Sequence, residues 1–429
     1  MTSDHLVELL HELDAPQHRY TQLSNYFEGN SPLSYLSADA KAALAKFDRM
    51  SSNLCRTAVV SLVERLRLAG FTPPDAWDLF LASNLDQLSA VAHRDALVYG
   101  TGYIFCWTDQ RGRPRATVES PRQVAVQRDP VTSDVVAAVK RVRTKTTTES
   151  WLYLPDRIEH WRAQTPGAAT AGFTLVKVVD NPLDVVPLVP LGLDDTSTLL
   201  DLLPIQDSLN KLLLDMMVAS EYTGRPRRWA TGVELIEKPL LDEDGEPVIE
   251  AGEPVLETVN PYPEANRMFL AENEQAHFGQ LSAADLAGFE AGVRIIIAQA
   301  MLVSGLPAHY VGALQDSVTS ADALRAAEAA LVSRAEAKQL AFGTGWENVA
   351  KLLLAIRDGA HPDDIDARVT WAPADTRSQA QEADAAQKLY AAGLLSRTTT
   401  LRKLGFTDDE IAEELRLSTA ENPNKRTQA

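Results

Sequence analysis

The sequence predicts a mixed α+β fold that is mainly helical. Two long stretches, 199–222 and 281–356, carry apolar residues at spacings of three and four, which indicates helices with one buried face. Between them and the N-terminus, residues 101–179 hold short runs of β-branched and aromatic residues divided by turn signals, which is typical of strands. A chain of 429 residues is long enough for about two to four compact lobes.

The composition is acidic, with a formal net charge of −18. Tight non-specific binding to DNA requires a basic protein, because neutralisation of phosphates drives affinity. An acidic chain is compatible with DNA as a neighbour that passes without being held. We expect the two cysteines, Cys55 and Cys106, to be buried free thiols rather than a disulfide framework. No uninterrupted run of about 18 apolar residues occurs, so no membrane span is predicted, and the acidic, amphipathic N-terminus argues against a signal peptide.

The first half of the chain predicts helices followed by an antiparallel meander. We expect a helix over 6–13, an arm at 18–37 that packs Tyr20, Tyr26, Phe27 and Tyr35 on a neighbouring surface, and a second helix from residue 37. An amphipathic helix over 53–71 should stop at Gly70, Pro73 and Pro74, and a further helix should cover 77–99. Strands are expected over 101–109, 117–126, 135–142, 151–161 and 173–179.

The second half predicts long helices around a small β segment. An extended, proline-rich stretch at 181–200 leads to a helix over 199–222, with Pro204 near its first turn. Residues 224–275 read as a β-hairpin excursion with acidic turns, and a helix over 282–304 ends at Gly305 and Pro307. After a loop at 305–318, a long helix is expected to be interrupted at Gly343 and Gly345 and to resume until 356. A strand at 369–371, a helix ending at Gly393, two short helices around Gly405 and a disordered tail after residue 418 complete the chain.

Motifs for catalysis or metal binding are not found. The chain has no glycine-rich nucleotide loop between a strand and a helix, and no HExxH, CxxC or GxSxG. His93 and Asp95 lie two residues apart in a helical stretch, a spacing that does not place them on one face. The run of Asp363, Asp364 and Asp366 is typical of a capped turn. We therefore predict no catalytic residue, no metal site and no cofactor.

The densest basic cluster consists of Arg225, Arg227 and Arg228 beside Trp229. These arginines could contact phosphate or an acidic partner, or they could pair with the acidic segment 237–257 that follows. Both readings stay open. For His309 beside Tyr310, in the loop between two helices, local packing is favoured over a role facing a cavity.

The order of several segments resembles one protein family. The segments are YFEGNSPLSYL, NLCRTAVVSLVERLRLAGF, LDQLSAVAHRDALVYGTGYIFCW, VESPRQVAVQRDP, DLLPIQDSLNKLLLDMM leading into RPRRWATG, SAADLAGFE, SADALRAAEAALVSRAEAKQLAFGTGWENVAKLLL, and a late WAP with SQAQEADA. Taken together, over about residues 20–415, they resemble the portal proteins of tailed bacteriophages of the long-tailed siphovirus type.

The resemblance implies a ring of about twelve copies at one capsid vertex of the virion, assembled in the host bacterial cytoplasm. Double-stranded DNA would be pumped in through its channel by the large terminase and would later leave towards the tail. Implied partners are the terminase, the major capsid and scaffolding proteins, and a head-tail adaptor, with no membrane and no enzymatic activity. The alternatives are a nucleic-acid-processing enzyme whose site is not recognisable from motifs, and a simple head-to-tail adaptor, which the length of the chain disfavours.

The parts of this family, called wing, stem, clip and crown, can be laid on the sequence. Residues 1–195 would be wing, 196–223 the first stem helix, 224–280 the clip, 281–304 the second stem helix, 305–318 the tunnel loop, 319–360 a long wing helix, 361–417 the crown and 418–429 a disordered tail. The tunnel-loop residues expected at the DNA channel are Gly305, Pro307, His309, Tyr310, Gln315 and Asp316. The expected docking surface on the clip consists of Asp242, Glu243, Asp244 and Glu246.

Overall fold

The chain forms two compact units in the computed structural model. The first comprises Met1–Pro32, Asn53–Pro204 and Gln299–Ala429, and the second comprises Leu33–Ser52 and Ile205–Ala298. The structure describes residues 2–30, 52–192, 196–224, 228–231, 236–240, 246–250, 253–259, 275, 277–280, 287–312, 321–375, 379–404, 406 and 408–421. Long helices and small antiparallel sheets make up both units, so the predicted mixed α+β class is confirmed.

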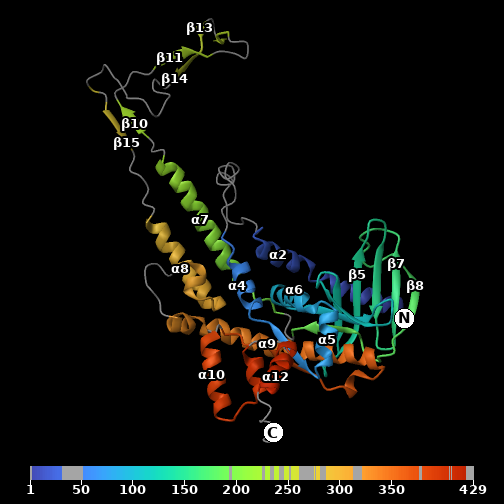
Figure 1. Ribbon diagram of the computed structural model, residues 1–429. Coiled ribbons are helices and arrows are strands. Elements are labelled where there is room, and N and C mark those ends of the chain that lie inside the picture. Colours follow the sequence, from blue (N-terminus) through green and yellow to red (C-terminus); the bar gives the residue numbers. More distant parts are fainter. Residues whose placement is uncertain are drawn as a thin grey trace. The chain divides into compact units, whose positions relative to one another are not determined.

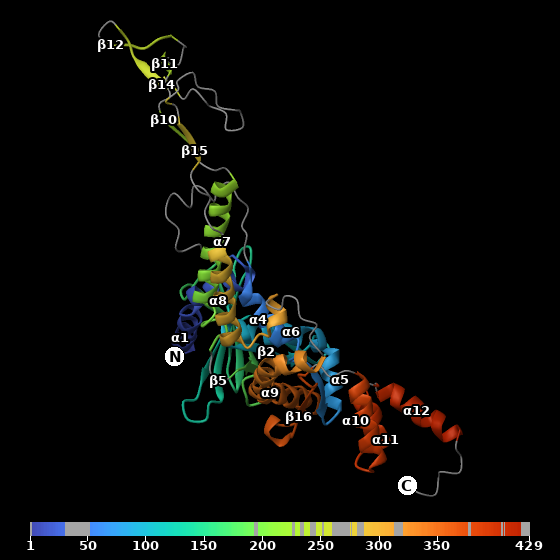
Figure 2. The same ribbon diagram turned by 90° about the vertical axis from the view of Figure 1, so that its left-hand side faces the viewer.

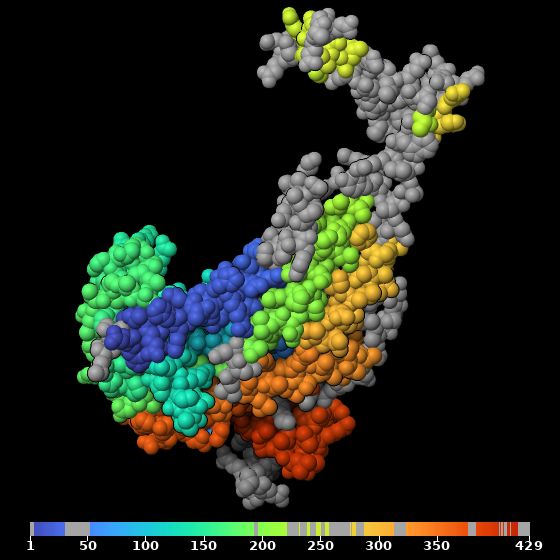
Figure 3. All heavy atoms as spheres, turned by 180° about the vertical axis from the view of Figure 1, so that it is seen from behind, coloured from blue at the N-terminus to red at the C-terminus, as the bar shows by residue number. Residues whose placement is uncertain are grey.

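The centre of the first unit is a five-stranded antiparallel meander in the order β4-β5-β6-β7-β8. Its strands are β4 (Val124–Arg128), β5 (Val135–Arg143), β6 (Thr148–Tyr153), β7 (Arg157–Ala163) and β8 (Phe173–Asp180). One face is covered by helix α1 (Thr2–Asp14), whose Leu6, Leu9, Leu10 and Leu13 are buried against Val139, Leu152 and Trp161. Figure 3 shows this blue helix lying against the green strands of the sheet.

The other face of the meander packs on a smaller sheet in the order β3-β2-β9. This sheet consists of β2 (Gly102–Thr108), β3 (Pro114–Glu119) and β9 (Leu188–Leu191). Tyr103 and Leu188 from the small sheet share one core with Ala138, Tyr153 and Ile158 from the meander. The first unit therefore has a helix, a sheet and a second sheet as successive layers.

A helical layer follows, dominated by the 38-residue helix α9 (Ala321–Asp358), which packs on α5 (Asp75–Ala82), on β2 and β3, and on β9. The expected interruption at Gly343 and Gly345 is wrong, because the helix runs through both residues. Here glycine serves close packing. A Cβ at Gly345 would lie 2.6 Å from Leu191 Cδ2 and 3.1 Å from the Pro190 carbonyl oxygen. The cost of glycine in a helix is thus offset by direct contact between α9 and β9.

The remaining elements of the first unit are short. They are α2 (Gln17–Glu28), α4 (Leu54–Val63), α6 (Leu85–Tyr99), the 3-10 turns η1 (Ala308–Val311) and η2 (Pro362–Asp364), the pair β1 (Leu68–Thr72) with β16 (Arg368–Trp371), and the C-terminal helices α10 (Gln379–Ala391), α11 (Arg397–Lys403) and α12 (Asp408–Glu421).

The second unit contains α7 (Leu203–Gly224) and the first part of α8 (Ala287–Ser304). Figures 1 and 2 both show these helices side by side. They approach closely at Gly292, where a Cβ would lie 2.8 Å from Leu212 Cδ2. The chain between the helices forms small antiparallel pairs: β10 (Arg228–Thr231) with β15 (His277–Gln280), β11 (Ile236–Pro239) with β14 (Leu256–Val259), and β12 (Ile249–Glu250) with β13 (Glu253–Pro254). A β excursion between two long helices is therefore confirmed.

Several expected boundaries were wrong. The arm expected at 18–37 is helical from Gln17 to Glu28, and the helix expected over 53–71 ends at Val63 and is followed by strand β1. The helix expected over 77–99 is divided in two at Asn84, which has φ 57. The strands expected over 117–126 and 151–161 each prove to be parts of two strands. Helix α12 continues past Ser418, where a tail was expected to begin. The helix expected from residue 37 lies outside the described residues.

Candidate functional site

The segment that follows α8, from Gly305 onwards, packs against other residues of the first unit. Gly305 ends the helix with φ +73, and the Arg334 side chain lies beneath it, so that a Cβ at Gly305 would be 2.8 Å from Arg334 Nε. Arg334 also donates a hydrogen bond from Nη1 to the carbonyl oxygen of Val303 in the last turn of α8. Leu306 and Pro307 are buried. The chain therefore leaves α8 in a fixed direction before it reaches η1.

Four polar side chains anchor η1, and we call them the root cluster: the buried Arg65 and Glu328, and the half-buried His309 and Tyr310. Arg65 Nη2 donates to Glu328 Oε2 at 3.2 Å and to the Tyr310 hydroxyl at 3.0 Å. His309 Nε2 lies 3.3 Å from Glu328 Oε1, and the guanidinium of Arg65 stands 5.7 Å from the centre of the Tyr310 ring. Two residues of η1 are therefore tied to α9 and to the segment that joins α4 to β1.

The ion pair at the centre of the root cluster is removed from water. The side chains of Arg65 and Glu328 are 6% and 11% exposed. Each ion lost hydration on burial, so the pair adds little net stability compared with apolar residues, but loss of one partner leaves the other charge uncompensated. Through its hydrogen bonds with Tyr310 and His309, the pair ties η1 to α9 and to the segment before β1.

Sequence reasoning found His309 and Tyr310 but missed Arg65 and Glu328. A signal for Glu328 is present in the spacing. Glu328, Leu331, Ala335, Gln339, Phe342 and Trp346 lie at successive intervals of three and four on α9, and all six are buried. A carboxylate on the apolar stripe of a helix requires a buried partner. Nothing local to the sequence identifies Arg65 as that partner, because the two residues are 263 positions apart.

Helix α8 presents an apolar stripe to solvent in the single chain. Ala291, Ile295, Ala298 and Leu302 follow each other at intervals of four, three and four, and all four are exposed. The exposed fractions of Ile295 and Leu302 are 63% and 78%. Within the described residues, α8 is the one helix long and apolar enough to cross a membrane, by length and composition alone. The sequence contains no unbroken apolar run of this length, because polar and small residues are spaced through α8.

The residues expected to contact DNA or partners are only partly described. Gln315, Asp316, Arg225, Arg227, Asp242, Glu243 and Asp244 lie outside the described residues. Arg228 begins β10, where its backbone pairs with that of Gln280. Glu246 is exposed. The structure therefore brings together His309 and Tyr310 of the predicted set, and it leaves open the roles proposed for the arginine cluster.

His93 has a packing role. Its ring lies against Phe342 and accepts a 2.8 Å hydrogen bond from Trp346 Nε1 to its own Nε2. Complete burial lowers the pKa of His93 to about 3, so that the ring is neutral near pH 7. Asp95 pairs with the adjacent Arg94 at 2.8 Å, and burial raises the pKa of its carboxyl group. Cys55 and Cys106 are buried free thiols, as predicted.

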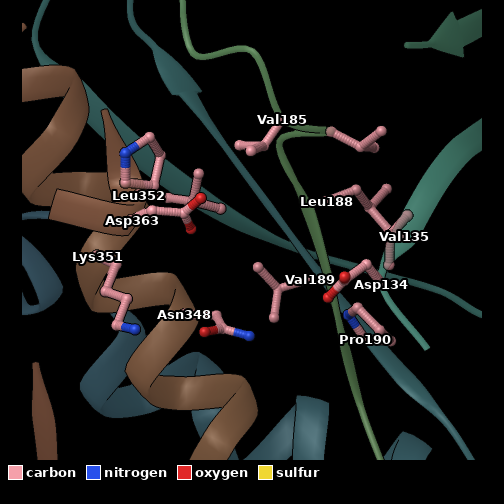
Figure 4. Close-up of a pocket in the computed structure, with 12 residues that line it drawn as sticks. Asp134, Val135, Val185, Leu188, Val189, Pro190, Asn348, Lys351, Leu352 and Asp363 are labelled. Atoms are coloured by element: carbon pink, nitrogen blue, oxygen red, sulfur yellow. The ribbon is translucent and has the colours of Figure 1, made fainter. Parts of the chain in front are cut away.

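A pocket of about 330 Å³ opens between α9 and the segment 185–190, which includes the start of β9. Figure 4 shows Asn348 and Lys351 of α9 on one side and Val185, Leu188 and Val189 on the other, with Asp134 nearby. The lining contains no histidine, cysteine or serine. Among the residues that the structure describes, no group of three or more metal-ligating side chains comes together.

Comparison with known proteins identifies a family. A family model described as "Phage portal protein, SPP1 Gp6-like" matches residues 8–425. The portal protein of Mycobacterium phage L5 is 28% identical over 393 residues, which covers 84% of this chain and 77% of that protein. The portal protein of Mycobacterium phage D29 is 28% identical over 396 residues, with the same coverage of 84% and 77%.

Two solved structures are similar to this chain at low sequence identity. A chain from the virion of a native gene transfer agent particle is 14% identical with a TM-score of 0.43, covering 86% of this chain and 94% of that one. A chain from the neck of a native gene transfer agent particle, computed with C12 symmetry, is 15% identical with a TM-score of 0.42, covering 87% and 95%. At these scores the structural likeness adds nothing to the evidence from sequence. The match of the family model over residues 8–425 shows that this chain belongs to the SPP1 Gp6-like family of phage portal proteins.

Proposed function

We propose that about twelve copies of this chain close into a ring at one vertex of a phage capsid, and that DNA enters and leaves the head through the central channel. The exposed stripe on α8 is the observation that carries this proposal. Ala291, Ile295, Ala298 and Leu302 alternate small and large apolar side chains on one face. A stripe with this spacing suits packing against a second helix. In a closed ring, the neighbouring copy covers it.

The loop at 305–318 is the proposed tunnel loop. Its first part is the segment seated by the root cluster, so the fixed direction out of α8 aims the rest of the loop. Residues Gln315 and Asp316 would then lie towards the channel. The formal net charge of −18 supports passage of DNA without tight binding, because like charges do not hold phosphates.

The other parts follow the order of the chain. We assign residues 196–223 and 281–304 to the stem, 224–280 to the clip, and 1–195 with the long helix 319–360 to the wing. Because β16 pairs with β1, we also assign 361–375 to the wing and place the crown at α10, α11 and α12. The clip surface at Asp242, Glu243, Asp244 and Glu246 is the proposed dock for the large terminase and later for the head-tail adaptor. Arg225, Arg227 and Arg228 would contact DNA or a partner at the junction of stem and clip.

The ring is tested by solution mass and negative-stain imaging of the purified chain and of Ile295→Lys/Leu302→Lys. The wild-type chain should form rings with a central hole, and the double variant should remain monomeric with an unchanged circular dichroism spectrum. Val131→Lys is the matched control, because Val131 is 89% exposed in the turn between β4 and β5 and is not part of α8. Rings that persist in the double variant would refute the role of the α8 stripe. Recovery of the wild-type chain with membranes, rather than as rings, would favour insertion of α8 into a bilayer.

We further propose that the chain has no catalytic activity of its own and relies on the terminase for energy. A metal-dependent nuclease assay on purified rings tests this directly. Nuclease activity that co-purifies with the ring through two chromatographic steps would overturn this proposal.

A further inference from the structure

Among the described residues, no strand pairs with the outer side of the apolar strand β8, which forms the edge of the five-stranded sheet. It pairs with β7 on one side and stands last in the strand order. Figure 1 shows β8 as the outermost strand of the meander. Seven of its eight residues are exposed, and the exposed fractions of Leu175, Val176, Val178 and Val179 are 49%, 48%, 44% and 37%. A long, apolar edge strand is a template for another strand, and natural proteins usually cover or charge such an edge.

A pocket of about 370 Å³ opens beside this edge. Trp107, Trp151 and Tyr153 are among its apolar lining, while Lys177 and Val179 of β8 contribute to the side nearest the edge. Lys140, at the pocket, is already paired with Glu119 at 2.7 Å. Lys177 makes no ion pair with another described residue. The pocket can therefore take a large apolar side chain, and its edge offers one uncompensated positive charge.

The position of β8 separates it from the proposed channel. Helix α9 joins the two regions. Near its start Glu328 contacts η1, and further along Gly345 contacts β9 and Lys351 lines a pocket with Val135 at the start of β5. At 1.5 Å per helical residue, the part of α9 from Glu328 to Gly345 or Lys351 is about 25 to 35 Å long. Three further strand spacings from β5 to β8 add about 14 Å. If η1 lies at the channel, β8 lies far from it, on the side of the wing that faces out of the ring.

We propose that β8 is the docking edge for the coat protein of the capsid shell, which adds an extended segment as a sixth strand. This inference rests on the proposed function, because the ring would place β8 at its outer rim. The backbone of the added strand would form hydrogen bonds with the outward-facing N–H and C=O groups of β8. Side chains on the pocket face would meet Lys177 and Val179, since directly opposed residues lie about 5 Å apart. The segment should therefore carry an acidic residue and a large apolar residue on one face.

The first test is site-directed photo-crosslinking. A benzophenone amino acid is placed at Val176 in the full-length chain, which is then co-expressed with the coat protein and irradiated within assembled capsids. We expect crosslinks to one extended segment of the coat protein. Crosslinks to a second copy of this chain, to a scaffolding protein, or to nothing would each overturn the proposal.

The second test is incorporation of the ring into capsids. Val176→Lys/Val178→Lys should reduce the fraction of capsids that contain the ring by about tenfold or more, which corresponds to a modest loss of binding free energy. Lys177→Glu should act in the same direction, and reversal of the acidic partner residue on the coat protein should restore incorporation. Val131→Lys, on the hairpin between β4 and β5, is the matched control.

Ring mass, measured on the same variants, keeps the two proposals distinct. If the wild-type chain forms no ring, the proposed function fails. If all variants form rings and β8 variants are incorporated as well as the wild-type chain, the ring stands and the docking edge is refuted.

Discussion

Breaking the buried ion pair of the root cluster should loosen the segment that leads to the tunnel loop. In Glu328→Gln, Arg65 loses its counter-charge while its side chain remains 6% exposed. An uncompensated buried charge of this kind costs about 3 to 5 kcal/mol. The cost falls on the arrangement that buries Arg65, so it should be expressed as easier local opening of η1.

Amide hydrogen exchange measures that opening residue by residue, and it does not require a chain of two units to unfold in one step. The Tyr310 amide donates to the Pro307 carbonyl oxygen at 3.0 Å and reports on η1 itself. A loss of about 3 kcal/mol should lower its protection on the order of 100-fold. Protection in the five-stranded sheet should not change.

Two further variants make the test specific. Arg65→Met/Glu328→Leu removes both charges together and should recover most of the protection, because an apolar pair of similar size avoids the desolvation cost. Asp384→Asn breaks the pair with Lys388 on α10, whose side chains are 61% and 73% exposed, and should have little effect. Unchanged protection of the Tyr310 amide in Glu328→Gln would refute the reasoning. So would a double variant in which that amide is protected no better than in the single variant.

Four other predictions concern single positions or short segments of the chain. His93→Asn should flatten the pH dependence of stability. Because the pKa of His93 is lowered to about 3, the neutral ring contributes fully to stability above pH 6.5, and this contribution is lost as the pH falls. Between pH 7 and 4.5, the free energy of unfolding from urea titrations should therefore fall by about 3 kcal/mol more in the wild-type chain than in the variant. Gly345→Ala should destabilise the packing of α9 on β9 by about 1 to 3 kcal/mol, seen as a lower urea midpoint, whereas Gly70→Ala, with nothing within 4 Å, should not. Gly305→Ala and Pro307→Ala should reduce the yield of DNA-filled heads while ring mass is unchanged, and normal packaging would count against the tunnel-loop assignment. Charge reversal at Asp242, Glu243 and Asp244 should weaken co-sedimentation of rings with the terminase; undiminished binding would remove the clip surface from the proposal.

The periodic parts of the fold could be predicted from the sequence, and the close contacts could not. The β meander and the helices α7 and α8 follow from apolar spacing, which is a local property. The continuity of α9 depends on contacts between distant segments, with Gly345 packed on Leu191 of β9 and Gly343 near Val369 and Trp371 of β16, so local propensity gave the wrong answer. The division of one expected helix at Asn84 was missed as well. Asn84 adopts a left-handed conformation, and the spacing of apolar residues does not reveal it.

The candidate site shows the same division. His309 and Tyr310 were found because they interrupt two strong helices. Arg65 was not found, because its role depends on a partner 263 residues away that only the folded chain brings within 3.2 Å. The stripe on α8 was overlooked for a different reason: each exposed residue is ordinary by itself, and the stripe becomes evident only when burial is known for the whole helix.

The α8 stripe and strand β8 are both exposed in the described part of the single chain, and their chemistry differs. The stripe on α8 belongs to a helix, whose own backbone hydrogen bonds are complete, so a partner need only match its shape. Strand β8 offers an open row of backbone groups as well, so its partner must bring an extended segment in register. A helix stripe suits repeated contact between identical copies, which meet with one geometry around a ring. An open strand edge suits capture of a segment from another protein. On our proposals, ring closure would bury the first surface and leave the second available, so the ring would form through α8 and would then present β8 to the shell.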